Sequence, residues 1–270
     1  MSEIYCVVDE VLKTHPALAC WRRSPQAQPR FSDAAVLTIA LLQGVFAVAT
    51  LKQTYRRVAQ TWRAAVPHLP SDKPWVARLH RLWPPVGRVL AATCGQAPSA
   101  ARVYLVDSKP LPLCAPIRHG RVRRLRDAGA YFGKTRKGWF FGFKLPLLRH
   151  LGGRVLTIIL TPGNWDDRAP ALAWVQTVDG GVTLGDLGDR GPEGAPTLAE
   201  DAERLLITRE RVPEHQFVLS QVRQGIETTF SQLWWKFVDR VFNRSWQGLW
   251  NTIQLQVLFY NLVHAGVLTV

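Results

Sequence analysis

Residues 102–107 read R-V-Y-L-V-D, which predicts a short β-strand that ends in an acid. Two more strands follow along the chain: residues 139–148 alternate apolar and polar side chains, and residues 154–161 form an apolar run. The pair Gly152-Gly153 between them predicts a hairpin turn. This region therefore begins with three predicted strands.

The pattern then changes. A helix is predicted over 168–178, followed by short strands over 182–186 and 204–208. A long helix is predicted over 218–242, because its apolar residues recur every three or four positions and so share one face: Val222, Ile226, Phe230, Leu233, Phe237 and Val241. Strands, a helix, two strands and a helical end predict an α/β domain over residues 98–270.

Residues 1–97 are predicted to form a separate helical domain. Ser32 is a suitable N-cap for a helix over 33–51, because its hydroxyl can accept a first-turn amide. Two more helices are expected over 53–65 and 74–94. We expect this domain to contribute DNA binding and dimer contacts, and an ordinary helical domain with solvated arginines is the alternative. The arginines concerned are Arg56, Arg57, Arg63, Arg78, Arg81 and Arg88.

The composition is that of a folded protein with an unusual charge. Of 270 residues, 47% are hydrophobic, which excludes disordered and low-complexity classes. The 34 Lys and Arg against 20 Asp and Glu give a net charge of +14, which indicates a polyanionic partner such as nucleic acid. The four cysteines are scattered, so neither a disulfide scaffold nor a structural zinc site is expected, and the cytoplasm is the expected location.

One uncharged stretch, residues 34–51, is about long enough to span a bilayer. Gln43 and Gly44 lie at its centre and much of the rest is alanine, which drives insertion weakly. We therefore expect a buried core helix here and no membrane partner.

Three carboxylates stand out by their positions. Asp107 and Asp186 end predicted strands, and Glu227 lies one residue off the apolar face of the long helix. Carboxylates brought together in this way can hold two Mg²⁺ ions, which activate an attacking oxygen and stabilise a leaving one at phosphorus. Arg223, four residues before Glu227, can pair with it. The ordinary alternatives are turn or cap residues for the aspartates and a surface ion pair for the glutamate, and Asp189 competes with Asp186.

From Asp107 onward the chain resembles the DDE transposases of bacterial insertion sequences. The similar segments are V-D-S-K-P-L-P-L-C (106–114), Y-F-G-K-T-R-K-G-W-F-F-G-F-K (131–144), L-T-P-G-N-W-D-D (160–167), G-D-L-G-D-R-G (185–191) and I-E-T-T-F-S-Q-L (226–233). The resemblance implies a ribonuclease-H-like mixed sheet flanked by helices, with Asp107, Asp186 and Glu227 as the catalytic, metal-binding triad. In the family's motif around the glutamate, Arg223 and Glu227 fit, whereas Ser220 and Trp234 stand where related transposases have Tyr and Lys. Of the phosphate contacts that the motif implies, only that of Arg223 therefore carries over.

Residues 118–137 are the most basic part of the chain, with eight Lys and Arg against Asp127 alone. This density predicts contacts to the DNA backbone, which set affinity rather than sequence preference, and a solvated loop is the alternative. The residues are Arg118, Arg121, Arg123, Arg124, Arg126, Lys134, Arg136 and Lys137. For Trp234 and Trp235, core packing is favoured over stacking on an unpaired base.

The resemblance implies a transposase that uses Mg²⁺ or Mn²⁺, two ions, to cut double-stranded DNA at terminal inverted repeats and join it to target DNA. A homodimer on the DNA of a bacterial nucleoid is expected. Two alternatives remain: a decayed transposase that only binds DNA, and a ribonuclease-H-like nuclease that never joins strands. A glycosidase is disfavoured, because a neutral sugar does not call for a charge of +14.

Overall fold

The computed structural model describes residues 1–14, 30–82, 86–87, 102–122, 125, 127–135, 137–178, 180–185, 204–208, 216–235 and 243–268. In residues 204–208, 216–223 and 234–235 only the backbone is described. The chain divides into two compact units. One comprises residues 1–96, 232–242 and 247–270, and the other comprises residues 97–231 and 243–246. The division into a DNA-binding and a catalytic domain at residue 98 stays a prediction.

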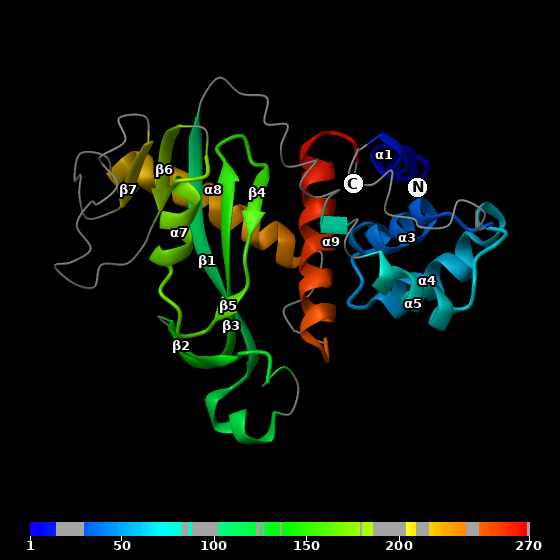
Figure 1. Cartoon of the computed structure of the whole chain (residues 1–270), viewed down its shortest axis with the longest axis horizontal. Coiled ribbons are helices and arrows are strands. Elements are labelled where there is room, and N and C mark those ends of the chain that lie inside the picture. The colour runs from blue at the N-terminus through cyan, green and yellow to red at the C-terminus, as the bar shows by residue number, and fades with distance from the viewer. Residues whose placement is uncertain are drawn as a thin grey trace. The chain divides into compact units, whose positions relative to one another are not determined.

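The second unit contains a mixed sheet of seven strands in the described ranges, with the order β2-β3-β1-β6-β7 (Figure 1). Strand β3 pairs antiparallel with β1, β2, β4 and β5, whereas β1 pairs parallel with β6 and β6 with β7. The strands are β1 (Val103–Cys114), β2 (Tyr131–Thr135), β3 (Gly138–His150), β4 (Val155–Ile158), β5 (Thr161–Pro162), β6 (Gly181–Gly185) and β7 (Arg204–Thr208).

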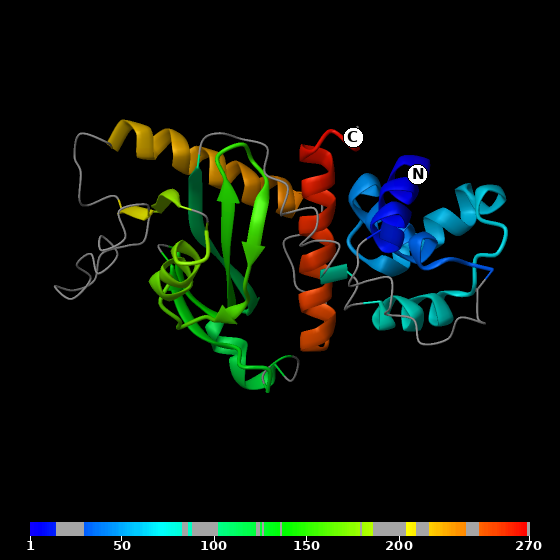
Figure 2. The same ribbon diagram turned by 45° about the horizontal axis from the view of Figure 1, so that its top comes forward.

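Two helices cover opposite faces of this sheet: α7 (Arg168–Val175) and α8 (Gln216–Trp235) (Figures 1 and 2). On the α7 face, Tyr104 and Val106 of β1 pack with Leu148 and Ala171 in a buried apolar cluster. On α8 the side chains of Ile226, Phe230 and Leu233 are buried, at positions of the predicted apolar face. The predicted α/β class, with a mixed sheet between helices, is confirmed.

Strand β2 is absent from the sequence prediction, which leaves residues 131–135 without an element. Its sequence Y-F-G-K-T is interrupted by Gly133, a residue that weakens strand propensity. The packing explains the glycine: a Cβ atom at this position would lie 2.4 Å from the Phe140 ring and 2.5 Å from the Gly163 carbonyl oxygen. The close packing at this position requires glycine, and the glycine weakens the strand pattern of residues 131–135 in the sequence.

The first unit is helical, as predicted. It contains α1 (Ser2–Thr14), α3 (Asp33–Phe46), α4 (Leu51–Thr61), the 3₁₀ turn η1 (Arg63–Ala65), α5 (Asp72–Arg81) and most of α9 (Trp246–His264), and the 3₁₀ helix η2 (Pro116–Arg121) lies in the other unit. Ser32 caps α3, since its Oγ accepts a hydrogen bond of 3.1 Å from the Ala35 amide. The predicted helix over 33–51 is wrong at its end: Ala47 is left-handed (φ 48°), and Thr50 with Gln53 forms a capping box that starts α4.

The core of the helical unit is fixed by side chains of α5. Trp75 is fully buried, and its Nε1 donates to the Val36 carbonyl at 3.4 Å. Arg78 donates through Nε to Asp33 Oδ1 at 3.0 Å and through Nη1 to the Phe31 carbonyl. Arg78 is therefore part of the fold of this unit, whereas Arg56, Arg57, Arg63 and Arg81 are exposed.

Within the described ranges, no single helix has both the length and the apolar character to cross a membrane. Helices α3 and α4 together have the required length and apolar character, but they are bent by 99° relative to each other. Helix α3 is buried along nearly its whole length. The predicted core helix is confirmed for residues 33–46.

Candidate active site

Asp107 lies within β1, opposite Leu147 of the antiparallel neighbour β3. Its side chain is half-buried, and Oδ1 accepts a hydrogen bond of 2.7 Å from the Ser108 amide. The sequence predicts a strand that ends at this residue. Instead β1 continues to Cys114, because β3 stays paired with it as far as that residue.

The Asp107 side chain lies on the face of β1 that α8 covers. Side chains alternate along a strand, so Leu105, Asp107 and Lys109 share one face. The Lys109 ammonium lies 5.8 Å from the ring centroid of Phe230, a residue of α8. Leu105 is paired across the strands with Arg149, which also contacts α8. Asp107 therefore stands between two positions at which the sheet is tied to α8.

Arg149 is the stronger of these ties. It is 8% exposed, and its Nη1 donates to the Gly225 carbonyl and to Thr229 Oγ1, each at 2.5 Å. Its Nε and Nη2 donate to the carbonyls of His150 and Leu151 at 3.2 and 3.0 Å. One guanidinium group thus links the β3 end to the middle of α8.

Glu227 lies on α8 between the two residues that Arg149 holds. Its side chain is exposed, while the preceding Ile226 is buried. This is the position at the edge of the apolar face that the helical spacing predicts. The structure places Asp107 and Glu227 on facing elements, and the helix side chain of Arg223 lies outside the described residues.

Asp186 also lies outside the described residues. The parallel strands β1 and β6 pair Val106 with Gly185, the residues that directly precede Asp107 and Asp186 in the sequence. The described part of β6 therefore ends beside the strand that carries Asp107. Asp189 lies outside the description as well.

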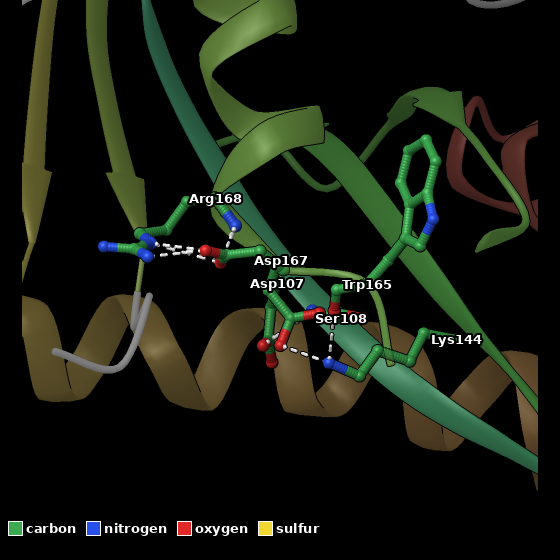
Figure 3. Close-up of polar contacts among 7 residues, drawn as sticks. Asp107, Ser108, Lys144, Trp165, Asp167 and Arg168 are labelled. Atoms are coloured by element: carbon green, nitrogen blue, oxygen red, sulfur yellow. Dashed lines mark hydrogen bonds and ion pairs between the residues drawn. The ribbon is translucent and has the colours of Figure 1, made fainter. Parts of the chain in front are cut away.

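A polar cluster lies between β3 and the segment before α7 (Figure 3). Lys144 is four residues from Leu148 on β3, so alternation puts it on the α7 side of the sheet. The Lys144 ammonium donates to the Trp165 carbonyl at 2.9 Å and to Asp167 Oδ2 at 3.1 Å. Asp167 Oδ1 and Ser108 Oγ are buried atoms with no hydrogen-bond partner among the described residues. Figure 3 shows Lys144 reaching toward the segment of β1 that carries Asp107 and Ser108.

The two adjacent aspartates before α7 have different partners. Asp166 accepts hydrogen bonds from the amide and the guanidinium of Arg168. The Arg168 side chain thereby lowers the pKa of the Asp166 carboxyl, against an opposing effect of partial burial. Asp167 stands at the N-cap position, but its side chain makes no cap hydrogen bond and pairs with Lys144. Of these two aspartates, only Asp166 accepts from a first-turn amide of α7.

Four of the eight predicted DNA-contacting residues are described, and all four are exposed. Arg118 and Arg121 belong to η2, Lys134 to β2, and Lys137 to the turn between β2 and β3. The other four, Arg123, Arg124, Arg126 and Arg136, lie outside the description, as do the side chains of Trp234 and Trp235.

The carboxylates suit a hard divalent cation by their chemistry, because Mg²⁺ prefers oxygen ligands. In the described ranges, no group of three or more His, Cys, Asp or Glu side chains is placed to hold a metal ion. Two acids of the predicted triad are described, Asp107 and Glu227, and the third is not. The carboxylate oxygens of Asp107 and Glu227 fit a Mg²⁺ ion by their chemistry. The complete set of three ligands stays a prediction.

Sequence reasoning missed Arg149, Lys144 and Lys109 as residues of this region. Lys144 lies in the predicted strand over 139–148, and Arg149 directly follows it; they are five positions apart, so alternation puts them on opposite faces. A charged residue in a largely apolar strand was the available signal, since a buried cation needs partners from another element.

Comparison with known proteins gives one match. A family model described as transposase DDE domain matches residues 98–233, which is half of the chain. No curated protein matches the chain, and no solved structure matches it. The matched range includes Asp107, Asp186 and Glu227, and it includes all seven strands.

Proposed function

Since the chain belongs to the transposase DDE domain family, we propose that it is a DNA transposase that cuts the ends of a mobile element and joins them to target DNA. The observation that carries this proposal is the placement of Asp107 on the face of β1 toward α8, the helix that carries Glu227. Asp186 follows the strand paired with β1 and is proposed as the third acid.

The sheet topology supports a ribonuclease-H-like fold for this domain. Antiparallel strands β1, β3 and β4 precede two parallel strands, β6 and β7, and α7 lies between the two groups in the sequence. In this arrangement the central strand β1 has an antiparallel neighbour on one side and a parallel one on the other. That puts the first acid in the middle of the sheet, where two other elements can reach it.

We propose that Asp107, Asp186 and Glu227 hold two divalent ions, Mg²⁺ or Mn²⁺. Bound there, such ions activate an attacking oxygen and stabilise the leaving oxygen in an in-line displacement at phosphorus. The protein's part is to hold its acids in place. The Ser108 amide orients the carboxylate of Asp107, and Arg149 fixes the turn of α8 on which Glu227 stands. Arg223 is proposed to orient Glu227 or to contact phosphate.

The exposed cations of η2 and of the β2–β3 hairpin are proposed to bind the DNA backbone. Arg118, Arg121, Lys134 and Lys137 are all accessible, and the wider segment carries only one acid. Contacts of this kind release counterions, so affinity falls steeply as salt rises. The helical unit is proposed to add DNA or dimer contacts.

The test is nicking of a supercoiled plasmid that carries the element's ends, with Mg²⁺ or Mn²⁺ and with an EDTA control. We expect metal-dependent cleavage by the wild type and none by Asp107→Asn or Glu227→Gln, which keep side-chain shape and remove charge. Glu10→Gln, an exposed acid of α1, is the matched control and should cut normally.

Three results would count against the proposal. Cleavage that survives in Asp107→Asn and Glu227→Gln would refute the triad. Cleavage without joining in a strand-transfer assay would favour the nuclease alternative. Salt-sensitive binding with no cleavage of the element's own ends would favour the decayed, DNA-binding alternative.

A further inference from the structure

The hairpin formed by β2 and the start of β3 carries an aromatic side chain in an unusual place. Trp139 is 59% exposed, although tryptophan is a residue that proteins bury on average. Lys134 is its cross-strand partner, and the Lys134 ammonium lies 5.7 Å from the Trp139 ring centroid. The lysine holds the ring by a cation–π contact and leaves most of its surface accessible.

The same face of the hairpin continues as a row of aromatic rings. Phe132 and Phe141 are also cross-strand partners and lie two residues inward from Lys134 and Trp139, with ring centroids 5.2 Å apart. His119 of η2 covers both of them, at 4.8 and 5.9 Å. Phe132 and Phe141 are therefore covered by η2, whereas Trp139, at the end of the row, is exposed.

The surroundings of Trp139 are cationic. Arg118 and Arg121 flank His119 on η2, and Lys137 lies at the hairpin turn next to the Trp139 strand, all of them exposed. The turn is fixed by Thr135, whose Oγ1 donates to the Gly138 carbonyl at 3.1 Å and accepts from the Lys137 amide at 3.2 Å. An exposed aromatic ring thus lies on a hairpin whose turn is fixed and whose neighbouring side chains attract phosphate.

Single-stranded DNA combines the two chemistries that this face offers. A duplex presents phosphates to the cations but keeps the faces of its bases stacked inside the helix. An unpaired strand presents both phosphates and bases, and stacking of a base on an aromatic side chain is a common basis of such binding. An apolar protein surface would match the ring but not the cations.

We infer that Trp139 is a stacking platform for an unpaired DNA base, and that this face of the β2–β3 hairpin binds single-stranded DNA. The inference rests on the proposed function as a DNA-acting protein. It adds a binding site for strand ends that are separated from their complement, and it assigns to Trp139 a role that the basic residues do not have.

The experiment measures binding of the full chain to two labelled probes, an oligothymidylate and a blunt duplex, by fluorescence anisotropy. Trp139→Ala should weaken binding of oligothymidylate by about 5- to 150-fold, because stacking on an aromatic ring contributes about 1–3 kcal/mol per base. Trp139→Phe keeps a ring and should stay within about threefold of the wild type by the same reasoning. Binding of the duplex should not change in either variant.

The control is Tyr131→Ala on the same hairpin. Tyr131 is 55% exposed but lies on the opposite face of β2, so its removal should leave oligothymidylate binding unchanged. An equal loss in Tyr131→Ala and Trp139→Ala would overturn the assignment of the face. Unchanged binding in Trp139→Ala, or an equal loss for both probes, would overturn the stacking role.

The outcomes also separate this inference from the proposed function. If the wild type binds duplex in a salt-sensitive way but binds oligothymidylate no better than Trp139→Ala does, only the stacking inference fails. If the wild type binds neither probe, the proposed function fails and the inference fails with it.

Discussion

The two faces of β1 differ in how they hold their helices. On the α8 face, a buried arginine and a lysine–aromatic contact join sheet and helix. On the α7 face, an apolar cluster of Tyr104, Val106, Leu148 and Ala171 makes the joint. An ion pair on that face, between Lys144 and Asp167, lies farther along the sheet. Neighbouring residues of one strand thus contribute to two different environments.

This difference indicates that the proposed chemistry takes place on the α8 face of the sheet. Asp107 and Ser108 are adjacent in the chain but point to opposite faces, because the side-chain period of a strand is two. A slip of one residue would exchange them and move the acid away from α8. The ten paired positions between β1 and β3 oppose such a slip and so keep Asp107 on the side of Glu227.

The largest change in cleavage rate is expected when the carboxylates on the two faces of the sheet are neutralised one at a time. Asp107→Asn should lower the rate of metal-dependent cleavage more than about 100-fold. Replacing a residue that only hydrogen-bonds to a metal ligand already lowers activity about 10- to 100-fold, and Asp107 is proposed as a ligand itself. Asp167→Asn, on the α7 face, should lower it less than about tenfold by the same scale. Initial rates of plasmid nicking at saturating Mg²⁺ measure both.

Equal losses of cleavage rate in Asp107→Asn and Asp167→Asn would contradict this difference and show that both faces contribute to the reaction. Circular dichroism of each variant serves as the folding control, because an Asp to Asn change keeps the side-chain volume.

A smaller effect concerns the stability of the two joints. Arg149→Met should lower the free energy of unfolding by roughly 2–4 kcal/mol, because hydrogen bonds from a buried charged donor contribute about 1.5–3 kcal/mol. Lys144→Met should lower it by about 1 kcal/mol or less, because the side chain of Asp167 is 38% exposed and water screens the pair. Urea unfolding followed by circular dichroism measures the two changes.

Thr229→Val is the matched control for the α8 joint, since it removes one acceptor of Arg149 and keeps the side-chain shape. Its cost should lie below that of Arg149→Met. A larger loss in Lys144→Met than in Arg149→Met would show that the α7 face carries the stronger polar joint.

The smallest effect is a pH dependence on the α7 face. Arg168 lowers the pKa of Asp166 in the folded state, so the pair stabilises the fold above the unfolded pKa of about 3.8, and this contribution disappears as the pH falls through the lowered folded value. In Arg168→Gln the pKa of Asp166 should rise toward its ordinary value. Carboxyl titration by NMR measures the shift.

The stability difference between the wild type and Arg168→Gln should shrink as the pH falls from about 4 through the lowered pKa of wild-type Asp166, because below that pKa both chains hold a protonated carboxyl. A difference that stays constant as the pH falls through the lowered pKa of Asp166 would assign the effect of Arg168 to packing instead of charge.

Several local features follow from short-range chemistry and were predictable. The strand over 204–208 has the predicted bounds, and Ser32 caps its helix as expected. The apolar spacing on α8 predicts which of its side chains are buried, including Ile226 and Phe230. Each of these depends on residues within a few positions of one another, so the sequence contains the whole cause.

Other features depend on partners that are distant in the chain. Strand β2 exists because β3 pairs with it, and its internal Gly133 fits only against Phe140 and Gly163. Propensity alone disfavours that glycine in a strand. The predicted helix over 33–51 misses the left-handed Ala47 for another reason: this break is made by local cap hydrogen bonds, which apolar periodicity does not reveal.

Apolar periodicity and short motifs are local properties of the chain, so the α/β class, the family resemblance and the candidate acids can be read from the residues alone. The folded arrangement is needed to see that Asp107 faces α8, that Arg149 ties this helix to the sheet, and that Trp139 is exposed beside Lys134. The physical reason is the strand register: which residues share a face depends on pairing between segments far apart, and one residue of shift reverses every side chain.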